Sequence, residues 1–232
     1  MGDYIYKILT DTEKLHQRSQ EASPFDKEGL DAVKRVVADL KSTLKANTDV
    51  PALAAPQLGS TLRIFCIKFN DGKIVEFVNP MITKSEGLHL TREKCKSIPG
   101  AEYIVPRNDR IIAVYQTTEG KVTSNKFEGA VAEIFQQMVN LLDGILISDF
   151  GLEVIPAFDK ASEEEKKEVL DWYINQLKES NQELQAEIES DEELKQVKGS
   201  IDFMSKVASG EITVENIEHK PETETGTANN EA

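Results

Sequence analysis

The sequence predicts an α+β protein with a C-terminal helical extension, and three observations support this. Apolar residues recur at helical spacing over residues 26–46 and again over 129–145. Segments with strand-like alternation lie between these two stretches, so the order is helix, strands, helix rather than a βαβ repeat. From residue 162 onward, charged stretches with helically spaced apolar residues follow. The second helix has a broad apolar stripe, as expected of a central helix packed on a sheet.

The individual elements follow from local signals along the chain. A short strand is expected over 4–9, and Asp26 is expected to cap the first long helix. Two hairpins are expected next, the first turning at Asn70-Asp71-Gly72 and the second at Glu119-Gly120. Their strands are expected over 63–69, 74–78, 110–117 and 121–127.

The chain is expected to divide into three parts: a body over 1–157, an acidic helical extension over 158–210 and a disordered tail over 211–232. Ser162 and Glu165 have the spacing of a capping box, which predicts a helix beginning there. Ser190 is expected to cap a second helix that ends at Gly210, so the extension is predicted to be a helical hairpin.

Charge is distributed unevenly between these parts. Residues 1–157 carry 19 Lys and Arg against 21 Asp and Glu, whereas residues 158–232 carry 8 against 20. The body therefore has a net charge of −2 and the remainder −12, and neither has the basic surface of a nucleic-acid-binding protein. No apolar run reaches the roughly 20 residues that cross a bilayer. With two cysteines and no recognisable secretion signal, a cytoplasmic protein without nucleic-acid or membrane partners is expected.

Three colinear motifs carry a family resemblance. Residues 53–59 read L-A-A-P-Q-L-G, residues 93–100 read E-K-C-K-S-I-P-G, and residues 136–146 read Q-Q-M-V-N-L-L-D-G-I-L. These segments resemble the peptide deformylase motifs G-x-G-L-A-A-P-Q-x-G, E-G-C-L-S-x-P-G and Q-H-E-x-D-H-L-x-G-x-L. The resemblance covers residues 4–155 and implies that family's fold, a mostly antiparallel sheet around a central helix.

The resemblance also implies a chemistry, which is removal of the formyl group from an N-terminal methionine by metal-assisted hydrolysis. In the family, one Cys and two His hold a divalent metal, a Glu handles protons, and a Gln with a backbone N–H stabilises the oxyanion. In this chain the Gln and Cys positions fall on Gln57 and Cys95. The two His positions fall on Gln137 and Leu141, and the Glu position falls on Met138. None of these three has the chemistry of the residue that it replaces.

Other departures lie beside these positions. Val50 and Ala52 stand where the first motif has glycines, and Lys94 stands where the second has one, so a narrower substrate groove is expected. His89, six residues before Cys95, is the one candidate for a replacement metal ligand. The expected cofactor content is none.

Several residues allow two interpretations. Gln57 either bonds loop backbone or contacts a ligand, and Cys95 is either a small buried residue or a nucleophile that lacks an evident base. Trp172 and Tyr173, with Leu177 on the same helix, either pack against the body or form a partner-binding surface. The acidic extension is either solvated surface or a contact for a protein partner.

These departures together predict a catalytically inactive member of the family. Its expected role is protein binding, assembly or structure, with a phage-encoded morphogenesis factor as one version. The alternatives are a pseudo-deformylase associated with the ribosome or nascent chain, and a hydrolase with altered or metal-independent chemistry.

Overall fold

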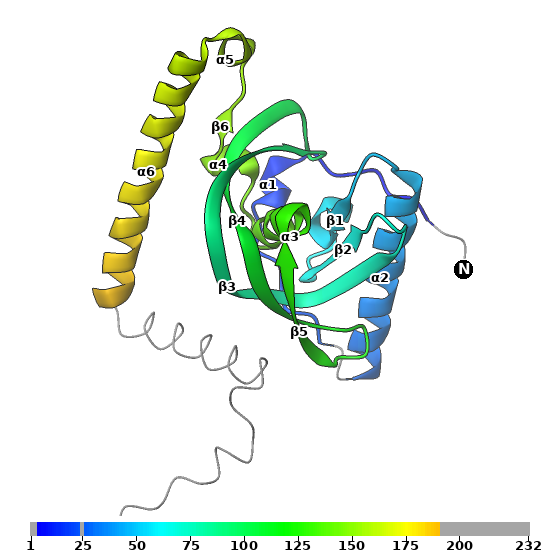
Figure 1. The fold of residues 1–232 in the computed structure, drawn as a ribbon. Coiled ribbons are helices and arrows are strands. Elements are labelled where there is room, and N and C mark those ends of the chain that lie inside the picture. The colour runs from blue at the N-terminus through cyan, green and yellow to red at the C-terminus, as the bar shows by residue number, and fades with distance from the viewer. Residues whose placement is uncertain (1–3, 24–25, 191–232) are drawn as a thin grey trace, which may run out of the picture.

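The computed structural model describes residues 4–23 and 26–190 and has an antiparallel sheet as its framework (Figure 1). Five strands lie in the order β1-β2-β3-β4-β5, and β6 pairs with β4. The strands are β1 (Ala52–Ala54), β2 (Ile64–Lys68), β3 (Ile74–Cys95), β4 (Ile98–Gln116), β5 (Val122–Glu128) and β6 (Leu152–Glu153). The helices are α1 (Thr12–Leu15), α2 (Lys27–Ala46), the 3-10 turn η1 (Ala55–Leu58), α3 (Gly129–Leu142), α4 (Ile147–Phe150), α5 (Pro156–Lys160) and α6 (Glu163–Ser190).

The two long strands β3 and β4 form one extended hairpin that curves around α3 (Figure 1). Cys95 is paired with Ile98, so the hairpin turns over Lys96 and Ser97 alone. The register shifts at three places, between Val78 and Met81, between Ile82 and Lys84, and between Glu93 and Cys95. Such irregularities bend a strand and increase its twist, which suits a sheet that wraps a helix.

Strand β2 is buried on both faces and separates two cores. Ile64 and Cys66 pack in a cluster with Leu40 and Leu44 of α2. Phe65 and Ile67 point to the opposite face and pack in the cluster that contains α3. Because side chains alternate along a strand, these four residues contribute to both cores in turn.

Aromatic rings fill the space between the sheet and α3. Phe135 of α3 packs edge-on against Phe65 and Phe77, with ring centroids 4.9 and 5.2 Å away, and stacks on Phe127 at 5.0 Å. The apolar stripe that predicted a central helix is therefore the buried face of α3, and the predicted fold is confirmed.

The structure has the helices predicted over 26–46 and 129–145 and the strands predicted over 63–69, 74–78, 110–117 and 121–127. Asp26 caps α2 as predicted, and its side chain accepts a hydrogen bond from the Gly29 N–H at 2.7 Å. The strand predicted over 4–9 is wrong. The backbone of this segment bonds to a side chain and a turn instead of a neighbouring strand. The Tyr6 N–H donates to Thr43 Oγ1, and the Leu9 N–H donates to the Gln57 carbonyl. β3 and β4 are also much longer than the strands predicted from their apolar ends.

The extension begins as predicted. The Glu165 N–H donates to Ser162 Oγ at 3.2 Å and the Ser162 N–H donates to the Glu165 carboxylate at 2.8 Å, which is a reciprocal capping box. One helix, α6, follows and lies beside the outer surface of the β3–β4 hairpin (Figure 1). The predicted second helix and the tail over 211–232 lie outside the described residues, so the division of the chain stays a prediction. Within the described ranges, no helix has the length and apolarity to cross a membrane.

Candidate functional site

A cleft of about 650 Å³ opens between the edge strand β1 and the first residues of β4. One wall is formed by residues 49–52, and the other by residues 98–102. Gln57, Cys95, Gln137 and Met138 line its inner end. The structure therefore brings together four of the five residues that the motifs singled out.

Gln57 lies at the inner end of the cleft and is 2% exposed. Its Oε1 accepts a hydrogen bond from the Ala54 N–H at 2.9 Å, which fixes the amide on its own turn. Its Nε2 donates to Ser97 Oγ at 3.1 Å and lies 4.0 Å from the Cys95 sulfur. Gln57 thus has the loop-bonding role that one interpretation gave it, while its donor group faces Cys95.

Cys95 ends β3 and is 7% exposed. Burial raises the pKa of its thiol, and hydrogen bonds from the Ser97 and Ile98 backbone only partly offset this effect. Since the thiolate is the nucleophilic form, Cys95 is a neutral thiol near pH 7 and a poor nucleophile. Its place in the α3-side core agrees with the interpretation of a small buried residue.

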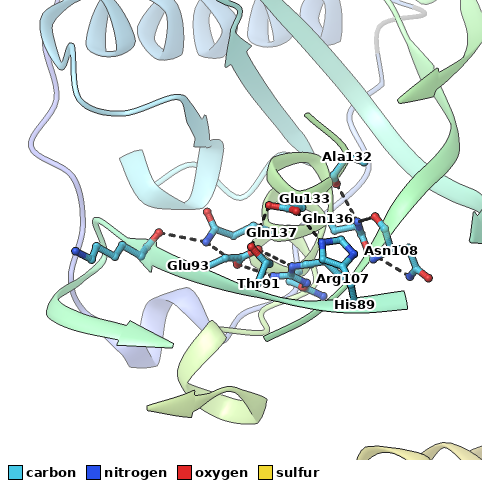
Figure 2. Close-up of polar contacts among 11 residues, drawn as sticks. His89, Thr91, Glu93, Arg107, Asn108, Ala132, Glu133, Gln136 and Gln137 are labelled. Atoms are coloured by element: carbon cyan, nitrogen blue, oxygen red, sulfur yellow. Dashed lines mark hydrogen bonds and ion pairs between the residues drawn. The ribbon is translucent and has the colours of Figure 1, made fainter. Parts of the chain in front are cut away.

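The central helix presents Gln137, Met138 and Leu141 on the side that faces Cys95. Met138 and Leu141 are each 2% exposed and belong to the same apolar cluster as Cys95. Gln137 instead lies at the cleft surface, where its Nε2 donates to Glu93 Oε2 at 2.9 Å and to the Lys94 carbonyl at 3.2 Å (Figure 2).

A buried ion pair lies beneath Gln137. Arg107 Nε and Nη2 donate to the two carboxylate oxygens of Glu93 at 2.7 and 2.9 Å, and the two side chains are 4% and 9% exposed (Figure 2). Arg107 Nη1 donates to Asn140 Oδ1 at 2.6 Å, and its guanidinium lies 5.5 Å from the centroid of the Phe150 ring. None of these residues had a role predicted from the sequence. Glu93 lay inside a quoted motif, but no local pattern marks Arg107.

His89 lies away from Cys95 and does not complete a metal site with it. Its Nε2 lies 2.8 Å from Glu133 Oε1, and Thr91 Oγ1 donates to the other carboxylate oxygen (Figure 2). The hydrogen bond with Glu133 raises the pKa of His89. His89 Nδ1 faces the Gly87 carbonyl at 3.2 Å, so both ring nitrogens face acceptors and the charged form is favoured.

The side chains at the inner end of the cleft do not fit the metal that the family resemblance implies. Leu141 has no donor atom, Met138 offers a thioether packed among apolar groups, and Gln137 offers only a neutral amide oxygen, which is a weak ligand for a metal that prefers thiolate and imidazole. Across residues 4–23 and 26–190, no three His, Cys, Asp or Glu side chains form a group that could hold a metal ion.

The cleft walls show where the motif glycines are replaced. Val50, Ala52 and Lys94 all line the cleft, so each adds side-chain atoms to its surface. Lys96 forms an ion pair with Asp49 at 2.5 Å at the cleft margin, and this contact lowers the pKa of Asp49. Lys94 lies 3.8 Å from the Glu102 carboxylate. Charges of both signs therefore surround the opening.

The residues named as a partner-binding surface lie on two sides of α6. The Tyr173 side chain faces the body, where its hydroxyl donates to the Phe150 carbonyl at 2.7 Å, and Leu177 is half-buried. Trp172 is 58% exposed, and Val169, one turn away, is also exposed. Tyr173 therefore packs against the body, as one interpretation predicted, and a partner contact at the exposed Trp172 stays a prediction.

Comparison with known proteins shows what the chain is similar to. The sequence profile of polypeptide deformylase matches residues 5–151. A peptide deformylase of Dictyoglomus turgidum is 38% identical over 153 residues, which cover 66% of this chain and 90% of that protein. One of Dictyoglomus thermophilum is 38% identical over 52% of this chain and 78% of the relative.

Solved structures agree with these sequence relatives. The crystal structure of peptide deformylase from Thermotoga maritima superposes with a TM-score of 0.57 at 28% identity, covering 63% of this chain and 97% of that one. The crystal structure of peptide deformylase from Thermus thermophilus gives a TM-score of 0.56 at 29% identity, covering 77% and 99%.

These findings correct the predicted loss of catalysis. Relatives that are 38% identical carry the name of an enzyme, so the prediction of a catalytically inactive protein, which was drawn from the substituted residues, is wrong. The changes at Gln137, Met138 and Leu141 show that one ligand set is missing, but a missing ligand set does not show that the chain lacks a reaction. The assembly role, the phage origin and the ribosome-associated pseudo-deformylase were versions of the same prediction, and none of them is retained.

Proposed function

Because the chain belongs to the polypeptide deformylase family, we propose that it acts on the amino-terminal end of a peptide bound in this cleft. The substrate class is the one in the relatives' name, a peptide with a formylated N-terminus. No step of the proposal passes through a metal at Cys95, Gln137 and Leu141, because these side chains do not fit one.

One observation carries the proposal: the cleft lies along the edge strand of the sheet. β1 pairs with β2 on one side only, and residues 49–52 form a wall of the cleft. An unpaired strand edge beside a cleft offers backbone donors and acceptors to an extended peptide, which can bind as an added strand. The opposite wall over 98–102 would confine such a peptide to one path.

Gln57 would orient the peptide's first group in this arrangement. Its Nε2 lies at the inner end of the cleft, where one hydrogen is donated to Ser97 Oγ and the other faces the Cys95 sulfur at 4.0 Å. The second hydrogen is the one that a carbonyl oxygen would accept, and the bond from Ala54 to Oε1 holds the amide in place. A fixed amide donor stabilises a carbonyl oxygen without having to reorganise. Met138 supplies an apolar surface beside it, and the buried Cys95 thiol stays neutral.

The proposal is tested with formyl-Met-Ala-Ser-amide, measuring binding by calorimetry and formate release in the same samples. Ala101→Arg should weaken binding at least about tenfold, because Ala101 lines the cleft and a long cation would occupy the path. Ala130→Arg makes the same change on an exposed part of α3 and should leave binding unchanged. Equal affinity of both variants, or no binding to the unmodified chain, would contradict the proposal.

We also propose that the outer face of α6 contacts a protein partner. Trp172 is 58% exposed and Val169 is 38% exposed, while Tyr173, on the adjoining side of the helix, bonds to the body. The first turn of α6 is acidic, with Glu163, Glu164 and Glu165, which favours a partner with an apolar contact bordered by basic residues.

This second proposal predicts that Trp172→Glu releases a partner that co-purifies with the full chain under native conditions. Gln176→Glu changes charge on the same helix without removing an apolar residue and serves as its control. A co-purifying protein retained equally by both variants would exclude Trp172 from the contact.

A further inference from the structure

The orientation of the Gln137 amide is determined by its partners. Its Nε2 donates to Glu93 Oε2 at 2.9 Å and to the Lys94 carbonyl at 3.2 Å. A carboxylate and a backbone carbonyl only accept hydrogen bonds, so the nitrogen has to face them and both of its hydrogens are used. Rotating the amide by half a turn would place its oxygen against two other oxygens.

The Glu93 carboxylate is held in place by Arg107. Arg107 binds both of its carboxylate oxygens, and Arg107 also donates to Asn140 one turn along α3 from Gln137. Bidentate pairing of this kind is geometrically specific. Strand β3, strand β4 and helix α3 therefore all contribute to holding one amide in one orientation (Figure 2).

The carbonyl oxygen of Gln137 remains for a ligand. Neither hydrogen bond of its side chain to the described residues uses Oε1, which points away from Glu93 (Figure 2). Gln137 lines the cleft together with Gln57. The Gln57 Nε2 donates to Ser97 Oγ and directs its second hydrogen toward the Cys95 sulfur 4.0 Å away. The inner end of the cleft thus holds an amide acceptor and an amide donor, each oriented by contacts within the protein.

We propose that Gln137 Oε1 accepts a hydrogen bond from the first nitrogen of the bound peptide, so that the cleft selects ligands whose first nitrogen carries a hydrogen. This inference rests on the proposed function and adds a specificity-determining residue to it. A formylated N-terminus has one N–H donor and one carbonyl acceptor, which complement Gln137 and Gln57 respectively. A tertiary amide keeps the carbonyl but has no donor.

The test uses two peptides, formyl-Met-Ala-Ser-amide and its analogue methylated on the formylated nitrogen. The unmodified chain should bind the first about five- to tenfold more tightly, the ratio expected for one hydrogen bond to a neutral group. In Gln137→Met, which keeps the side-chain length and removes the acceptor, this ratio should fall to about one. Gln176→Met, the same change on the exposed surface of α6, should retain it.

A second variant keeps the test decisive if Gln137→Met fails to fold. Gln137→Asn retains the amide but shortens the side chain by one methylene, and it should also reduce the ratio. An unchanged ratio in either folded variant, or equal binding of both peptides by the unmodified chain, overturns this inference and leaves the proposed function standing. Binding of neither peptide to the unmodified chain overturns the proposed function, and this inference with it.

Discussion

Two contacts join β3 to successive turns of α3, and they differ in burial. Glu93 meets Gln137 and Arg107 at the cleft, where the Arg107 and Glu93 side chains are 4% and 9% exposed. His89 meets Glu133 one helical turn earlier, where the side chains are 36% and 25% exposed. Both contacts bring opposite charges within 3 Å, yet only the first removes them from water. Burial, rather than distance, should decide how much each contact matters for stability.

The largest expected effect comes from Glu93→Ala. Removing the carboxylate leaves the Arg107 charge buried without an anionic partner, with its bond to Asn140 and its contact with the Phe150 ring, which should lower the free energy of unfolding by about 3–5 kcal/mol. Urea denaturation measures this directly. Glu133→Ala, the matched change at the exposed contact, should cost less than about 1 kcal/mol. Equal losses of unfolding free energy in the two variants would show that burial does not decide how much each contact contributes.

Replacing the whole buried pair separates its net contribution from the cost of an unpaired charge. The double variant Glu93→Leu with Arg107→Met should recover most of the stability lost in Glu93→Ala, because apolar side chains of similar volume carry no desolvation cost. Recovery is measured in the same denaturation series. A double variant as unstable as Glu93→Ala would show that the pair is net stabilising here.

A smaller loss is expected from Asn140→Ala. This change removes one acceptor from Arg107 and leaves the bonds to Glu93, so a loss of about 1.5 kcal/mol is expected for a hydrogen bond to a charged group. Asn125→Ala, at an exposed position of β5, provides the control for a surface amide. A loss no larger than the control's would mean that Asn140 does not support Arg107.

The smallest effect concerns pH and the exposed contact. Glu133 from α3 and the Gly87 carbonyl hold the pKa of His89 above its unfolded value near 6.5, with Asp109 of β4 adding to the effect. The stabilisation is therefore complete below that unfolded value and is lost as pH rises through the folded pKa. The difference in stability between the unmodified chain and His89→Gln should be at most about 0.5 kcal/mol after solvent screening. This difference in stability should shrink at alkaline pH. A difference that grows with pH would contradict the conclusion that the protonated form of His89 stabilises the fold.

The sequence predicted the parts of this molecule whose signals are local. Periodicity located α2, α3 and β2, and Ser162 with Glu165 marked the start of α6. The extent of β3 was missed because residues 83–93 are mostly polar, with Leu88 and Leu90 as the apolar exceptions, and lie on a strand with register shifts, so alternation is weak there. The strand predicted at 4–9 had the right composition, but its neighbours in space offer side chains and a turn instead of a strand edge.

The candidate site divides in the same way. Gln57, Cys95, Gln137 and Met138 could be identified because motifs fixed their spacing, and the fold brings them to one cleft. Arg107 could not be identified, because its role depends on a partner 14 residues away across the β3–β4 hairpin and on Asn140 of α3. The orientation of the Gln137 amide depends on that contact, so it could not be inferred from the motif alone.

The two-sided burial of β2 gives the protein a built-in pair of reporters. Cys66 belongs to the cluster beneath α2 and Cys95 to the cluster around α3, so the two thiols lie in different cores. Burial raises the pKa of each thiol and slows its modification by a thiol reagent. Cys66 is fully buried and reacts only when the surrounding layer opens, whereas Cys95 also lines the cleft. Labelling of Cys66 would therefore report opening of the α2 layer, and slower labelling of Cys95 in the presence of a peptide would report occupation of the cleft.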